Sequence, residues 1–125
     1  VLTNAATTVV DTDNVGISNT DITVSMDAAG AYTLTGANIE KLGAGESATV
    51  TFNVQVIDDS GSGDATSVAQ AITLTIDGSN DTPTISAYTA ANVAENTLTG
   101  SISTADVGTT DVDTTDTHSF VVLTN

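Results

Sequence analysis

Acidic and amide side chains gather in a short stretch of the sequence where neither a helix nor a strand is expected. Asp77, Asn80 and Asp81 lie in this stretch, which ends at Pro83, the only proline of the chain. Proline fixes its own φ angle and favours an extended conformation in the residue before it, so the stretch suits a taut connector better than a hairpin turn. We therefore interpret residues 77–83 as a junction between two domains that binds a hard cation.

A second pair of carboxylates, Asp111 and Asp113, is separated by a single residue. Alternate residues of an extended chain share a face, so both carboxylates are expected on the same side. Calcium takes about 6–8 oxygen ligands in lax geometry, whereas magnesium demands a stricter octahedron and zinc prefers nitrogen or sulfur. The predicted cofactor is therefore calcium (Ca2+). Other acids, such as Asp27 and Asp59, are interpreted as solvated surface charges.

Two other kinds of site find little support. Asp11 and Asp13, followed by Gly16, share only the opening of an EF-hand loop, because the bidentate glutamate is absent at the required distance. This segment is predicted to be a turn. Catalysis is not expected, since there is no Gly-x-Ser-x-Gly elbow and aromatic residues make up only 3% of the chain, which leaves no platform for stacking a sugar. His118 is isolated and is expected to be structural or exposed.

The composition excludes several classes of partner. There are 16 acidic residues against a single lysine, Lys41, and no arginine. Nucleic acid is nearly excluded and an anionic membrane surface disfavoured, because both need Lys and Arg. No apolar run approaches the roughly 20 residues that span a bilayer, so membrane insertion is not expected. No signal peptide opens the chain, and we expect its first residue to be an internal point of a longer precursor.

The spacing of apolar residues predicts an all-β fold. A chain this acidic and poor in aromatic residues could be disordered, but its hydrophobic residues, 39% of the chain, fall in alternating runs. Residues 36–45 are expected to form one short helical turn, and Asp27 to Gly30 a type I turn of a hairpin. About seven short strands favour a two-sheet, immunoglobulin-like Greek-key β-sandwich. The predicted strands are a pair or strand end within 1–10, then 22–26, 32–34, 48–57, 72–77, 98–103 and 118–123, with 85–93 extended.

The strongest strand signal is at residues 48–57. Val50, Phe52, Val54 and Val56 alternate with polar residues and are predicted to face the core.

An internal repeat joins the two ends of the sequence. Val1–Asn4 recurs at Val122–Asn125, an offset of 121 residues. Coincidence or a cloning choice is one explanation, and a tandem array with this period is the other.

Several segments resemble the VCBS-type repeats of giant bacterial surface proteins, which are similar to cadherin domains. Residues 30–63 and 71–85 resemble the second half of such a repeat, and residues 93–120 resemble the first half of the next. The resemblance covers most of the chain from Asp21 to Phe120. It implies a cadherin-like sandwich at the bacterial cell surface, used as a tandem spacer in large repeats-in-toxin (RTX) adhesins.

The resemblance also implies calcium ligands. Asp111 and Asp113 match the cadherin Asp-x-Asp pair, the run Val-Ala-Glu95-Asn resembles the glutamate motif of the first strand, and residues 77–83 resemble the linker. One departure is that the cadherin Leu-Asp-Arg-Glu motif reads Leu-Gly-Ala-Gly at 42–45, with Glu46 as a possible substitute. The predicted metal ligands are Asp77, Asn80, Asp81, Glu95, Asp111 and Asp113.

The resemblance divides the chain into two parts. Residues 1–81 would be the later strands of one repeat, and 82–125 the junction and early strands of the next. The connector is too short to turn back across a sandwich, since an extended chain advances at most ~3.3–3.6 Å per residue. We therefore expect residues 85–122 to pack against the 1–81 region of another copy, because each part alone leaves open sheet edges.

These observations predict a calcium-stabilised structural extender of a large, extracellular bacterial adhesin. It would rigidify a tandem array that projects a ligand-binding region from the cell surface. Its partners would be neighbouring copies of the same repeat, end to end, with cell-surface glycans or proteins bound through other regions. The alternative is a cadherin-like module that binds carbohydrate or protein directly, and a groove lined by Tyr32, Tyr88 and asparagine side chains would favour it.

Overall fold

The computed structural model of the chain describes residues 2–5, 8–61, 63 and 66–124. Six strands and one short 3-10 helix follow one another within these residues, and all of them precede the connector. They are β1 (Leu2–Ala5), β2 (Thr8–Asp11), β3 (Ile22–Met26), β4 (Tyr32–Gly36), η1 (Ile39–Lys41), β5 (Ser47–Val54) and β6 (Gln70–Asp77).

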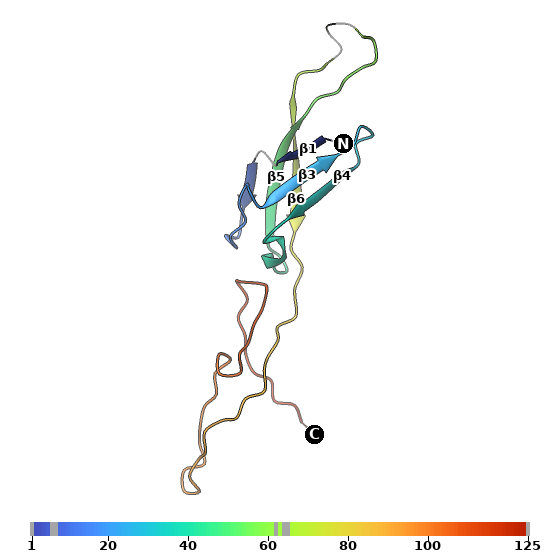
Figure 1. The fold of residues 1–125 in the computed structure, drawn as a ribbon. Helices are drawn as coiled ribbons and strands as arrows, with labels where there is room; N and C mark the ends of the chain where they lie inside the picture. The colour runs from blue at the N-terminus through green and yellow to red at the C-terminus, as the bar shows by residue number, and fades with distance from the viewer. Residues whose placement is uncertain (1, 6–7, 62, 64–65, 125) are drawn as a thin grey trace.

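The six strands form two antiparallel sheets of three strands each, in the orders β1-β3-β4 and β2-β5-β6. The predicted strand pair at the start of the chain is present, but its two members enter different sheets, because β1 pairs with β3 and β2 pairs with β5. Figure 1 shows the two sheets at one end of the molecule. The described fold is therefore all-β, with η1 as its helical turn, as predicted.

The hairpin of β3 and β4 closes through the predicted turn. The Gly30 N–H donates to the Asp27 carbonyl oxygen at 3.1 Å. The Asp27 carboxylate accepts from the N–H groups of Ala29 and Ala31, both at 2.9 Å. Gly30 has a φ of 91°, a left-handed conformation that glycine adopts without the penalty of a Cβ atom. The turn therefore sets the register of the hairpin, with Ile22 opposite Gly36.

The core is one cluster of apolar side chains from both sheets and the loops between them. Alternate residues of β5 are buried, as a period of two predicts. Val56 does not fit the prediction, because it is 73% exposed. β5 ends at Val54, and the chain beyond it leaves the sheet. The buried members of the cluster are Val15, Ile17, Ile22, Val24, Leu42, Ala48, Val50 and Phe52.

The loop after β2 is held by a single carboxylate. Asp11 accepts hydrogen bonds from the backbone N–H groups of residues 15, 16 and 17 at 3.2, 2.8 and 3.0 Å. Partial burial raises the pKa of Asp11, but these N–H groups, with that of Asn14, outweigh it and hold the pKa below its usual value. The segment is a turn, as predicted, and it places the buried side chains of Val15 and Ile17 in the core.

After β6 the chain leaves the sheets and extends beyond them, where it folds back on itself (Figure 1). Thr84 and Thr110 exchange backbone hydrogen bonds of 2.8 and 3.0 Å. The strands predicted at 98–103 and 118–123 are wrong, because neither range belongs to a strand. A strand needs a neighbour for its N–H and C=O groups, and the connector carries both ranges away from the sheets. The side chains of Ile102 and Phe120 are accordingly exposed.

Candidate functional site

The connector begins with a close contact to the loop that follows η1. The Gly78 N–H donates to the Glu46 carbonyl oxygen at 2.9 Å. A Cβ atom at Gly78 would overlap the carbonyl oxygens of Leu42 and Gly43. A residue without a side chain is therefore required here. This contact fixes the direction in which the connector leaves β6.

Asp113 ties the C-terminal segment to the connector. Its side chain is buried, with only 1% of its surface exposed, and its Oδ2 atom accepts from the Asp81 N–H at 2.7 Å. It lies against the backbone of Gly43, where an added Cβ would come within 3.4 Å of it. The Asp113 Oδ1 atom is buried and has no hydrogen-bond partner among the described residues. Burying a carboxylate oxygen without a donor costs free energy, which a bound cation would offset.

Glu46 joins the same region from the other side. Its Oε2 atom accepts from the Gly43 N–H at 2.8 Å, and its Oε1 atom accepts from the hydroxyl of Thr115. Glu46 therefore links the loop before β5 to the segment that carries Asp113. It lies directly after residues 42–45, at the position that the sequence analysis gave as a possible further ligand.

Asp111 is engaged by two neighbours. Its Oδ1 atom accepts from the Asp113 N–H at 3.1 Å, and its Oδ2 atom lies 2.8 Å from Nε2 of His118. The hydrogen bond with His118 is the main cause that lowers the pKa of Asp111 below its usual value. Asp111 is therefore held as a carboxylate, and His118 occupies one of its oxygen atoms.

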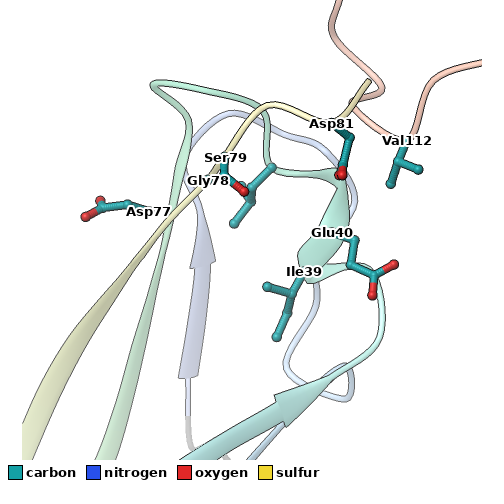
Figure 2. Close-up of a pocket in the computed structure, with 8 residues that line it drawn as sticks. Ile39, Glu40, Asp77, Gly78, Ser79, Asp81 and Val112 are labelled. Carbon is teal, nitrogen blue, oxygen red and sulfur yellow. The ribbon is translucent and has the colours of Figure 1, made fainter. Parts of the chain in front are cut away.

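The other three predicted ligands lie less favourably. Asp77 is exposed at the end of β6, and Figure 2 shows its side chain directed away from Asp81. The amide nitrogen of Asn80 donates to the Asp81 carbonyl oxygen, and the side chain is exposed. Glu95 is exposed in the turn closed by the Ala94–Thr97 bridge, within the segment that extends away from the sheets (Figure 1).

A pocket of about 350 Å³ lies beside the connector (Figure 2). Its lining includes three acidic residues, Glu40, Asp77 and Asp81, and the apolar residues Ile39 and Val112. Within the described part of the chain, no group of three or more His, Cys, Asp or Glu residues is placed to hold a metal ion together. The structure thus brings Asp81, Asp111 and Asp113 into one region without arranging them as a complete coordination shell.

Three residues of this region were missed or undervalued by sequence reasoning. The sequence indicates an isolated His118, yet it contacts Asp111 across a separation of 7 residues. No sequence motif assigns a role in the site to Glu40 or Thr115. Spacing offers no signal for Thr115, because it lies 69 residues from its partner Glu46. For Glu40, the one signal in the sequence is its position as an acidic residue within the predicted helical turn.

Comparison with known proteins gives no relative: no family model, no curated protein and no solved structure matches the chain. The described residues also contain no helix that is long and apolar enough to cross a membrane.

Proposed function

We propose that this chain is a calcium-stabilised structural extender of a large extracellular bacterial adhesin. It is one phase of a tandem repeat, with residues 1–81 belonging to one domain and 82–125 to the junction and the start of the next. Arrays of such domains would hold a ligand-binding region away from the cell surface. Their finer architecture would be a cadherin-like Greek-key sandwich of about seven strands, completed by residues of a neighbouring copy.

The observation that carries the proposal is the buried Oδ1 atom of Asp113, which has no hydrogen-bond partner among the described residues. A buried carboxylate oxygen is normally satisfied, and an exception requires a cause such as an ion. The unpartnered Oδ1 atom lies beside the connector, because the Oδ2 atom of the same carboxylate accepts from the backbone N–H of Asp81. A cation at this point would act on the angle between domains.

The carboxylates of Asp81, Asp111 and Asp113 fit a hard cation, because calcium prefers oxygen ligands. One of the two oxygen atoms of Asp111 already contacts His118. Asp81, Asp111 and Asp113 would hold calcium, and Glu46 is a further carboxylate that the Thr115 hydroxyl links to the same segment. The bound ion supplies positive charge that offsets the repulsion between these carboxylates. The protein's part is to hold the connector through Gly78 and Asp113, so that the donors stay near one another.

Melting the chain in EDTA and in calcium tests the proposal. With a Kd of about 10⁻⁴ M and free calcium near 10⁻² M, binding stabilises the folded state by roughly 2.7 kcal/mol per site. For a chain of this length, that corresponds to a rise in Tm of ~10 °C. Magnesium at the same concentration is the matched control and should have a smaller effect, because it dehydrates reluctantly.

The extender role needs a shape measurement as well. In a chain with residues 1–121 followed by a second copy of 1–125, small-angle X-ray scattering should give a longer, more rigid particle in calcium than in EDTA. A Tm indifferent to EDTA, together with an unchanged particle length, would refute the proposed function.

A further inference from the structure

An apolar groove of about 890 Å³ opens between the two sheets, at the Val54 end of β5, opposite the end where Ser47 pairs with Asp77. Its walls combine the end of β3, the end of β5 and the chain that follows each of them. Val56 and Ile57, at its rim, are 73% and 72% exposed. Such an apolar surface on a small, highly acidic protein marks an interaction site. The main apolar lining residues are Val24, Met26, Phe52, Val54, Val56 and Ile57.

The same chain carries an apolar segment that is left in solvent. Residues 120–123 read Phe-Val-Val-Leu, and Val121 alone is 81% exposed. This segment extends away from the sheets in the single chain (Figure 1). Each copy thus presents an open groove at one end and an exposed apolar segment toward the other.

The repeated tetrapeptide relates the segment to the groove. Val122–Asn125 is identical to Val1–Asn4, and the described part of the first copy lies in β1. β1 runs antiparallel to β3, with Leu2 opposite Met26. A chain that continues β1 in the N-terminal direction therefore passes Met26 and reaches Asp27, and both residues line the groove. In the repeat, the residues that precede this strand are those that end at Val121.

We propose that residues 84–121 of one copy of this chain dock along the groove of a second copy, with Val121 next to the start of β1 in that copy. The inference rests on the tandem arrangement in the proposed function, but it does not depend on calcium. The contact is heterologous, because it joins a segment at one end to a groove at the other. A heterologous contact joins separate molecules into a linear array unless the rotation between copies closes a ring.

The first test changes the phase of the chain. Placing residues 84–121 directly before residues 1–83 gives an unbroken repeat, because the two tetrapeptides are identical. The re-phased chain should be monomeric in analytical ultracentrifugation, with a Tm above that of the original chain and independent of concentration. The original chain should form oligomers whose size grows with concentration. An original chain that stays monomeric would overturn the proposal, and so would a re-phased chain that melts no higher.

The second test uses three matched substitutions of exposed valines. Val56→Asp places a charge in the groove and Val121→Asp places one in the docking segment, whereas Val10→Asp alters an exposed residue of β2 outside the groove. Each of the first two variants should be monomeric alone. Mixed together they should form a 1:1 complex and stop there, because each retains one of the two complementary surfaces. Val10→Asp should assemble like the unaltered chain.

Other outcomes of the mixing experiment contradict the inference. Assembly that persists in both Val56→Asp and Val121→Asp would mean that another surface joins the copies. Two monomeric variants that fail to combine would mean that the groove and the segment are not partners. Both tests are run in EDTA and in calcium. Assembly in EDTA with no effect of calcium on Tm would reject the calcium site and keep the docking. A Tm raised by calcium in a chain that does not assemble would keep the calcium site and reject the docking.

Discussion

Replacing Asp113 by asparagine tests whether its buried carboxylate serves a cation. Asparagine keeps the shape of the side chain, and its amide oxygen can replace Oδ2 of Asp113 as the acceptor of the Asp81 N–H. In EDTA the substitution exchanges a charge-assisted hydrogen bond for a neutral one, a loss of about 1 kcal/mol. It also removes a buried charge that has no cation, whose burial costs several kcal/mol, but it places an amide NH2 group without an acceptor at the buried position of Oδ1, which costs about 1–3 kcal/mol. Asp113→Asn is therefore expected to leave the unfolding free energy unchanged in EDTA, or to raise it by ~1–2 kcal/mol.

In calcium the sign of the effect should reverse. Losing a ligand that holds the connector removes most of the roughly 2.7 kcal/mol that the bound ion contributes. Because the substitution raises the stability in EDTA by up to ~2 kcal/mol, the Tm of Asp113→Asn should then fall by a net ~3–10 °C relative to the unaltered chain at 10⁻² M calcium. Calorimetric melts of both chains, with EDTA and with calcium, give the four values needed.

The control is Asp59→Asn, the same chemical change at an exposed residue in the loop between β5 and β6. Its effect on Tm should be small and the same in both solutions, since exposed charges contribute little. If Asp113→Asn lowered the Tm equally in EDTA and in calcium, the carboxylate would be a purely structural acceptor for Asp81, and the reasoning from its unpartnered oxygen would be wrong.

Two further substitutions separate the core from the loops. Phe52→Ala should lower the unfolding free energy by about 3–5 kcal/mol in denaturant titrations, with or without calcium, because it removes a buried ring from the cluster between the sheets; a dependence on calcium would contradict the separation of core and junction. Asp11→Asn should cost about 2 kcal/mol at neutral pH, because three backbone N–H groups lose a charged acceptor. The pKa of Asp11 is lowered by folding, so its contribution is present above its ordinary value of 3.8 and is lost as the pH falls through the lower folded value. The variant's stability should therefore fall less steeply than that of the unaltered chain in melts below pH 4, and parallel curves would contradict the role of Asp11.

The strands before the connector could be predicted because each one carries its own signal. Ile22 and Val24 alternate with polar residues, and Asp27 and Gly30 specify the turn that follows. The same pattern could not say where β5 ends. Periodicity assigns Val56 to the core face, but only the length of the partner strand decides whether a sheet still exists at that position.

The strands expected after Pro83 failed for a different reason. Residues 98–103 and 118–123 have the composition of strands, but pairing depends on a neighbour, and composition does not identify that neighbour. In the single chain the connector leads them away from both sheets (Figure 1). The alternation of apolar and polar residues therefore indicates that a segment can form a strand when a neighbouring strand is available. In our proposal, a second copy of the chain supplies that neighbour.

The junction shows the same limit at the level of side chains. Asp81 and Asp113 are 32 residues apart, and the Asp-x-Asp motif alone indicated that the second of them matters. Asp77 has the right chemistry for a calcium ligand, but it comes directly after Ile76, whose side chain lies on the half-buried face of β6. Because side chains alternate along a strand, the Asp77 side chain lies on the exposed face. Glu46 meets Thr115 across 69 residues, beside the point where the Gly78 N–H holds the connector to the Glu46 carbonyl oxygen, and no local pattern encodes that contact.

The two proposals assign different tasks to the two ends of one domain. At the connector, polar groups and a cation would set direction, because hydrogen bonds and coordination are directional while apolar burial is not. At the groove, apolar burial would hold copies together, since it supplies attraction between two strongly acidic chains that would otherwise repel each other. In a tandem array each domain contacts only its neighbours, so its stability is the sum of such terms along the chain. Removing calcium should therefore bend an array at its connectors without separating its domains, whereas Val121→Asp should separate copies without changing the calcium affinity of each connector.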